Sequence, residues 1–356
     1  IRGRRKDSFY RRLSVFMSKV IICQNPFEKM WNLFTYFENE EITKNLLYTA
    51  YLAREKDKEA LTLAYQNTVK FIYLLKQGVT YFEAARNSEL MVQPLLLYYG
   101  MTSLMKMLIL LHDPHYPSST LVLQHGLTTR KKKKMNYSFF SDVVKIQKDG
   151  LLPHFYKTVF AEGLESNKRY VISHLLGLIP ELQTCLHMLF KSRTMLPVTV
   201  EQRDERTYLF SFAKQDLEQE KLHFSSIYHL FQTAPSDNIK KINILDEQLA
   251  IVMKTERPIH PLKPIHNQVY EDYTGKHYFY FKEQAPNLGE IVIYNLIMFV
   301  LGMLCRYDTE QWGEIIYSLH SADLFLIKEL IQLTLRKFPN IVLNYLYGEK
   351  VCFKIV

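Results

Sequence analysis

The stretch MVQPLLLYYGMTSLMKMLILL, residues Met91 to Leu111, is one of two long apolar segments in the chain. The second, IVIYNLIMFVLGMLC, covers residues 291–305 and is shorter than the roughly 20 residues that a membrane-spanning helix needs. Pro94 and Lys106 interrupt the first. We therefore expect both segments to be buried core helices, with no membrane partner.

Helical patterns surround these two segments. Asn25 can cap a helix that begins at Pro26. A helix from about residue 58 to 76 is expected to end at Gly78. Residues 169–176 also have a helical pattern, and Pro339 is expected to end a helix that starts near residue 322.

The character of the sequence changes near Met195. MLPVTVEQR (195–203) and TYLFSFA (207–213) have strand patterns, and YEDYTGKHYFYF (270–281) has the pattern of a hairpin. The sequence predicts a mainly α fold, in which a bundle-like helical core carries a smaller α+β insertion. The expected parts are a basic arm (1–16), an N-terminal helical part (17–194), the insertion (195–285) and a C-terminal helical part (286–356).

Composition excludes several classes of site. The chain has only 12 glycines, and it contains neither of the glycine-rich nucleotide-binding strings, G-x-G-x-x-G and G-x-x-x-x-G-K-[ST]. Its four cysteines are far apart, without the C-x-x-C spacing of a zinc cluster. We expect no metal, no cofactor and reduced thiols, as in a cytoplasmic protein.

Positive charge is concentrated in two short segments. The first is the arm at residues 1–16, interpreted either as translated sequence upstream of Met17 or as a disordered basic arm. The second is the run Arg130, Lys131, Lys132, Lys133 and Lys134. Together these segments exceed the net charge of +9 for the whole chain, so the remainder is nearly neutral.

The basic run follows HGLTT, residues 125–129. Adjacent lysines repel one another unless they are solvated or neutralised by an anion. His125, Thr128 and Thr129 would add hydrogen-bond donors to the five cations, so the loop 125–134 is a candidate phosphate site. The alternative is a solvated loop without a ligand. Arg306, at the end of the second apolar segment, is a further candidate anion ligand.

A second candidate site is RYVISH, residues Arg169 to His174. This R-x4-H string resembles the signature of HEPN-family ribonucleases. The resemblance implies a dimer in which the histidine acts as acid or base and the arginine holds the phosphate charge. Tyr170 departs from the family pattern, in which a polar residue follows the arginine.

Longer strings resemble a family. QPLLLYYGMTSLMKMLIL (93–110), DPHYPSSTLVLQHGLTTRKKKKMNYSFFSDVVKIQKDGLLPHF (113–155), RYDTEQW (306–312) and RKFPNIVLNYL (336–346) are similar to the YaaC-like proteins of Bacillus and its relatives. The resemblance covers about residues 25–350 and leaves out the arm at 1–16. It implies a bacterial cytoplasmic protein, and it implies no particular reaction.

The function that we expect from the sequence is binding rather than catalysis. The predicted ligand is a nucleic acid or a phosphorylated small molecule, held by the loop 125–134. Two alternatives stay open: a HEPN-like ribonuclease that uses Arg169 and His174, and an interaction scaffold whose insertion (195–285) docks a protein. The sequence sets no oligomeric state.

Overall fold

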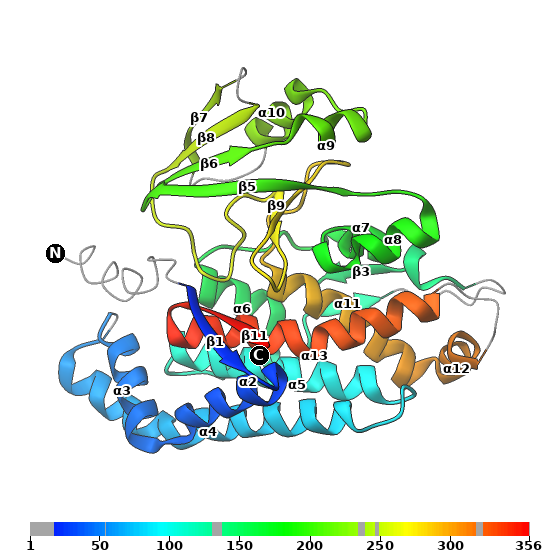
Figure 1. The fold of residues 1–356 in the computed structure, drawn as a ribbon. Helices are drawn as coiled ribbons and strands as arrows, with labels where there is room; N and C mark the ends of the chain where they lie inside the picture. Colours follow the sequence, from blue (N-terminus) through cyan, green and yellow to red (C-terminus); the bar gives the residue numbers. More distant parts are fainter. Residues whose placement is uncertain are drawn as a thin grey trace.

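Figure 1 shows the computed structural model of the chain, which describes residues 18–53, 55–129, 137–233, 239–245, 249–317 and 323–355. Of these residues, 56% are helical and 18% lie in strands. The prediction of a mainly α protein with some β structure is confirmed. The bundle-like core and the domain boundaries stay predictions. The basic arm (1–16) and the run Arg130–Lys134 lie outside the described residues.

The first half of the described chain is mostly helical. Its elements are β1 (Ser18–Cys23), α2 (Pro26–Phe34), η1 (Thr35–Glu38), α3 (Glu40–Tyr51), α4 (Asp57–Arg86), α5 (Gln93–His112), η2 (Leu121–Leu123), β2 (Leu127–Thr129), η3 (Phe139–Ser141), β3 (Val143–Ile146), α6 (Leu151–Phe160), β4 (Arg169–Val171), α7 (Ile172–Gly177), η4 (Pro180–Leu182) and α8 (Gln183–Phe190). Strands β2, β3 and β4 form a small antiparallel sheet in that order. The predicted cap is confirmed, since the side chain of Asn25 accepts a hydrogen bond from the Glu28 amide at 3.2 Å.

The second half begins with a lobe built on a sheet and ends in helices. Its elements are β5 (Met195–Asp204), β6 (Thr207–Ser211), α9 (Lys214–Gln219), α10 (Phe224–Thr233), β7 (Ile239–Leu245), β8 (Ala250–Thr255), β9 (Val269–Glu271), β10 (His277–Tyr280), α11 (Glu290–Tyr307), α12 (Thr309–Tyr317), α13 (Asp323–Tyr347) and β11 (Lys350–Ile355). Strand β11 returns to pair in parallel with β1.

The two apolar segments become α5 and α11, which pack against each other in the main hydrophobic core. Both helices are long and apolar enough to cross a membrane by length and composition. However, 78% of the apolar window of each is buried inside the protein. Side chains on every side of α11 from Ile291 to Val300 are almost fully covered. A helix that is apolar all round needs such cover in water.

Helix α4 continues past Gly78, so the expected end at this residue is wrong. Gly78 instead lies where α4 crosses α5. A β-carbon at Gly78 would come within 2.7 Å of the Leu104 side chain, and one at Gly100 within 2.7 Å of the Phe82 ring. These two glycines let the helices approach closely, and this packing outweighs the weak helix propensity of glycine.

Pro339 does not end a helix either, because α13 runs through it to Tyr347. A proline inside a helix removes one hydrogen bond and crowds the preceding turn. The turns beyond Pro339 are held by contacts with other helices. Tyr347 donates to the Leu33 carbonyl at 3.1 Å, and the Tyr345 hydroxyl lies 2.5 Å from Nε2 of His112. Tertiary packing therefore offsets the local cost.

The sheet lobe has its own hydrophobic core. Its six strands have the order β7-β8-β6-β5-β10-β9 and are antiparallel throughout. Alternate residues such as Val198, Phe210 and Met253 face Phe224 and Phe231 of α10. Figure 1 shows α9 and α10 beyond the sheet, on the side away from the helical part. The strands predicted at 195–203 and 207–213 and the hairpin at 270–281 are confirmed.

We expect Gly100→Ala to lower the free energy of unfolding by about 1–3 kcal/mol, because the new methyl group overpacks the crossing of α4 and α5. The measurement is denaturant unfolding of the parent and the variant. Gly313→Ala is the matched control: Gly313 also lies in a helix, but a β-carbon added there would meet nothing within 4 Å. This control should gain up to about 1 kcal/mol. Equal effects at both glycines would contradict the close-approach role of Gly100.

Candidate functional site

The structure brings together two residues that the sequence singled out, His125 and Arg306. His125 lies just before β2, and Arg306 lies in the last turn of α11. The charge of Arg306 is close enough to His125 to lower the pKa of its imidazole. Lys131–Lys134 and Arg130 cannot be placed beside them, because the basic run lies outside the described residues.

A backbone crossing fixes the position of His125. The next residue, Gly126, has a φ of +75° and packs directly on Gly150, whose φ is +130°. A β-carbon on Gly150 would lie 2.3 Å from the α-carbon of Gly126. The carbonyl of His125 also accepts a hydrogen bond from the Leu152 amide at 3.3 Å. Only glycine fits at either position, so the local sequence around His125 is tightly constrained.

The ring of His125 contacts Tyr98 of α5. The Tyr98 hydroxyl lies 3.0 Å from Nδ1, and the centre of the Phe299 ring lies 5.7 Å from that of the same imidazole. Burial raises the pKa of Tyr98, so its hydroxyl keeps its proton and can donate it to Nδ1. In that tautomer the ring proton of neutral His125 is on Nε2, and Nε2–H is a hydrogen-bond donor.

Two cations share this neighbourhood. Burial lowers the pKa of His125 most, and the charges of Arg306 and Lys106 lower it further. Lys106 lies seven residues after Tyr99 on α5, which places both on one helix face. Burial also lowers the pKa of Lys106. Within the described ranges, neither Lys106 nor Arg306 forms an ion pair with a carboxylate.

Aromatic rings extend the site beyond the cations. Arg306 donates through Nη1 to the Tyr99 hydroxyl at 3.0 Å, and its guanidinium lies 4.9 Å from the centre of the Tyr307 ring. Tyr81 of α4 stacks on Tyr99 at 5.8 Å. We call Lys106, His125, Arg306 and these three tyrosines the cation–tyrosine site. Its chemistry suits an anion that has a planar or apolar group attached.

The threonines predicted to join this site do not share one surface. Thr128 is exposed and accepts a hydrogen bond from Gln147 at 2.8 Å, whereas Thr129 donates to Asp142 at 3.4 Å. Successive residues of β2 point to opposite faces, so one phosphate cannot take both hydroxyls. Tyr137, which follows the basic run, also donates to Asp142, at 2.8 Å. Thr129 before the basic run and Tyr137 after it therefore both donate a hydrogen bond to the carboxylate of Asp142.

The R-x4-H string is not on one helix: the expected helix at 169–176 is confirmed only from Ile172, in α7, and is wrong at 169–171, which form β4. Arg169 lies in β4, opposite Lys145 of β3, and His174 lies in the short helix α7. The pairing of β4 with β3 favours strand over helix at Arg169. Both side chains are exposed, and Nδ1 of His174 lies 2.9 Å from a Glu283 carboxylate oxygen. The HEPN-like interpretation thus loses the helical context that motivated it.

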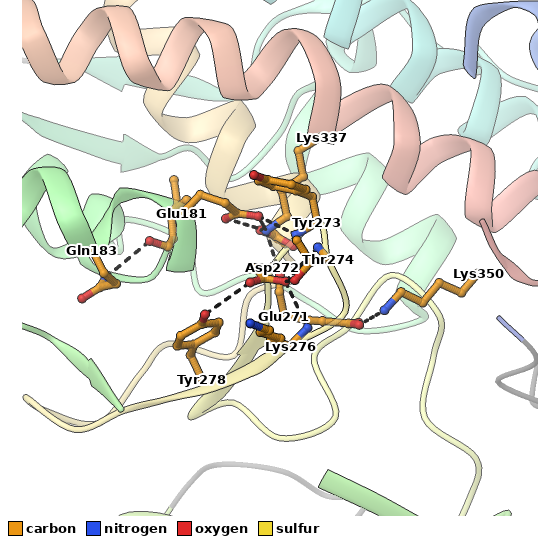
Figure 2. Close-up of polar contacts among 12 residues, drawn as sticks. Glu181, Gln183, Glu271, Asp272, Tyr273, Thr274, Lys276, Tyr278, Lys337 and Lys350 are labelled. Atoms are coloured by element: carbon orange, nitrogen blue, oxygen red, sulfur yellow. Dashed lines mark hydrogen bonds and ion pairs between the residues drawn. The ribbon is translucent and has the colours of Figure 1, made fainter. Parts of the chain in front are cut away.

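A second cluster of charged groups lies where the β9–β10 hairpin meets the helices (Figure 2). The ammonium group of Lys337 lies among Glu181, Glu290 and the carbonyl of Glu271. We call Glu181, Glu290 and Lys337 the junction cluster. Its ammonium is fully occupied by protein oxygens, so it does not offer a free cation to a ligand. The part of the chain that the structure describes contains no group of three or more metal-ligating side chains.

Sequence reasoning missed Lys106, Tyr98 and Tyr99. One signal was present, since Lys106 is a single cation within a core helix, where a charged side chain is rarely placed without a partner. Nothing in the sequence distinguishes Tyr98 and Tyr99 from the other tyrosines, of which the chain has 24 in all. Their role depends on Arg306 and His125, which approach them only in the folded chain.

Comparison with known proteins gives one match. A family model described as YaaC-like Protein matches residues 35–346. The matched range includes Lys106, His125 and Arg306. No curated protein and no solved structure matches the chain.

Proposed function

We propose, starting from the fact that the chain belongs to the YaaC-like protein family, that it binds a phosphate-bearing ligand at the cation–tyrosine site. The observation that carries the proposal is the convergence of Lys106 and Arg306 on His125 without a neutralising carboxylate from the described residues. Lys106 and His125 are half-buried and Arg306 is exposed, and like charges placed together destabilise the protein to the extent that water or an anion does not compensate them.

Each side chain of the site has a distinct part in binding. Arg306 provides a planar donor group, already oriented by the Tyr99 hydroxyl. Lys106 provides a point charge on a stem that packs along α5. Neutral His125 donates through Nε2–H. These contacts would neutralise one or two phosphate groups, and the proposal is one of binding rather than catalysis.

The ligand class that fits best is a nucleotide rather than a long nucleic acid. Tyr99 and Tyr307 contact Arg306, and Tyr81 stacks on one face of Tyr99, so a base could stack on a remaining ring face; base–aromatic stacking is worth about 1–3 kcal/mol per base. A nucleic-acid groove needs cations along several phosphates, whereas this site has them at one place. The basic run at 130–134 stays a predicted additional contact and carries no part of this argument.

We expect Lys106→Met and Arg306→Gln each to weaken nucleotide binding by roughly ten- to a hundredfold. A hydrogen bond to a charged group is worth about 1.5–3 kcal/mol, and each variant removes such bonds. Equilibrium dialysis with labelled AMP and ATP at low and moderate salt measures the effect, and binding should weaken as salt rises. Methionine matches the lysine stem, so α5 keeps its packing.

Lys157→Gln is the control, because Lys157 is an exposed lysine on α6, outside the cation–tyrosine site. It should bind like the parent. A short single-stranded RNA is the second arm of the experiment. Tighter binding of this RNA than of the nucleotides would shift the proposal to nucleic acid. Unchanged binding of all three ligands by the Lys106 and Arg306 variants would refute the site.

The pKa of His125 gives an independent test. Burial, and after it the charges of Arg306 and Lys106, hold the pKa of His125 below its ordinary value, so the negative charge of a bound phosphate should raise it. The complex then takes up protons, and affinity should increase as the pH falls from 7 toward 6. Proton NMR titration of the imidazole, with and without AMP, measures this change. In Arg306→Gln the pKa of free His125 should rise toward its ordinary value, and the shift caused by AMP should shrink. A pKa that AMP leaves unchanged would show that no anion binds beside His125.

A further inference from the structure

The β9–β10 hairpin is seated on the helical part by one buried ammonium group. Lys337 of α13 donates to Glu181 at 2.9 Å and to the carbonyl of Glu271 at 2.8 Å, and it also contacts Glu290. Only 5% of its side chain is exposed. Figure 2 shows Lys337 above the hairpin turn and Glu181, which belongs to η4, to one side of it. A single residue thus connects α13, η4, α11 and the hairpin.

The turn itself is rigid. Asp272 accepts hydrogen bonds from the amides of Thr274 at 2.8 Å and Lys276 at 3.0 Å, and from the Tyr278 hydroxyl at 3.3 Å. The Tyr273 amide donates outward to Glu181 at 2.8 Å. The hairpin therefore contacts Glu181 and Lys337 as a preformed unit. The stability of its contact with α13 and η4 depends on the charges of the junction cluster.

The charges of this cluster do not balance when both acids are ionised. One ammonium faces two carboxylates, whose side chains are 8% exposed for Glu181 and 18% for Glu290. Asp272 adds another negative charge nearby, and the carboxylate of Glu271 is paired with Lys350. An uncompensated charge in so buried a place is strongly unfavourable. One of the two acids must be neutral for the seat to be stable.

Hydrogen bonding decides which acid is neutral. One oxygen of Glu181 accepts from the Tyr273 amide, and both oxygens lie within 2.9 Å of the Lys337 ammonium. A proton on Glu181 would compete with these donors. Glu290 has Lys337 as its partner and accepts no hydrogen bond from a backbone amide of the described residues, so a proton on it displaces fewer donors. The hydroxyls of Tyr270 and Tyr294, which are buried and have no hydrogen-bond partner within the described residues, interact electrostatically with its carboxylate.

The electrostatics agree with this geometry. Burial raises the pKa of Glu290 most, Lys337 opposes the rise, and Glu181 and Asp272 add to it. For Lys337, burial opposes the charge, but the two carboxylates outweigh burial and its pKa is raised. The ammonium therefore stays charged over the range in which Glu290 titrates.

We propose that a proton on Glu290 neutralises the junction cluster, and that losing this proton weakens the seating of the β9–β10 hairpin on α13 and η4. The groups that face Glu290 are Lys337 of α13, Glu181 of η4, Tyr294 of α11, and Tyr270 and Asp272 of the hairpin. Glu271, with His277 at 4.0 Å and Lys350 beside it, completes the surroundings. The inference is independent of ligand binding at the cation–tyrosine site.

The raised pKa of Glu290 determines how the stability of the hairpin contact changes with pH. A carboxyl whose pKa is raised in the folded protein stabilises the fold fully below its ordinary pKa, and this contribution is lost as the pH rises through the folded value. The seat should therefore loosen toward alkaline pH. Buried histidines act in the opposite sense, because burial lowers the pKa of His260 to about 3 and the pKa of His266 and His277 to about 4. Their effect ends at the ordinary histidine pKa of 6.5, whereas the loss at Glu290 runs from the ordinary carboxyl pKa of 4.5 up to its raised pKa of about 7. A window from about pH 5 to 8 covers this loss, and comparison with Glu290→Gln separates it from the histidines.

The experiment is hydrogen exchange of the hairpin amides across this window, in the full chain. In the parent, the protection of the Tyr273 amide should fall with rising pH by up to about tenfold per pH unit, the limit for one linked proton. Glu290→Gln imitates the protonated acid, so its protection should not fall as the pH rises. Glu310→Gln, at an exposed position in the first turn of α12, should behave like the parent.

A second pair of variants tests the charge balance. Lys337→Met leaves two carboxylates without their cation, so hairpin protection should be low at every pH. Adding Glu290→Gln to Lys337→Met should restore part of it. Infrared difference spectra after a pH jump should show a carboxylic acid band that is missing in Glu290→Gln. Constant protection in the parent, or the same pH dependence in Glu290→Gln, would overturn the proposal.

Discussion

The packing of α5 is the constraint on which the rest of the structure depends. This helix is apolar on nearly every side, so it must be enclosed, and helices from both ends of the sequence enclose it. Helix α4 can approach it closely because Gly78 and Gly100 remove side chains at the crossing. Helix α11 covers another side, with Gly302 against Tyr98. The cation–tyrosine site forms at the border of this enclosure, where Lys106, Tyr99 and Arg306 reach water from core helices.

Much of the fold could be predicted from local pattern. The apolar periodicity of residues 91–111 and 291–305 located the core helices, and the alternation after Met195 located the sheet lobe. The errors have a common cause. Gly78, Pro339 and the segment at Arg169 were interpreted by their local preferences, and each is decided by a neighbour distant in sequence: α5, the helices that contact α13, and strand β3. Single-sequence reasoning has no access to those neighbours.

The candidate site shows the same limit in chemical terms. Counting charges drew attention to the run at 130–134, whereas the described geometry puts the cations Lys106 and Arg306 around His125. Nothing in the spacing of these three residues suggested that grouping in advance, because half of the chain separates His125 from Arg306. Each of these two was named for local reasons, and they approach each other only because the segment before β2 packs against α5 and α11. Asp142, which binds residues on both sides of the basic run, was equally invisible, because its role depends on the β2–β3 pairing.

The parallel pairing of β1 with β11 has a consequence for how the chain is made. Ser18–Cys23 leaves the ribosome long before its partner, Lys350–Ile355, which is synthesised only after the last helix described, α13. Until then, the backbone groups of β1 that pair with β11 have no strand partner, and Val20 and Ile22 stay exposed even in the folded chain. Contacts this distant in sequence form slowly. Residues 18–23 of the nascent chain are therefore available for non-native strand pairing until β11 has been synthesised. A chaperone that binds this segment during translation would reduce such pairing.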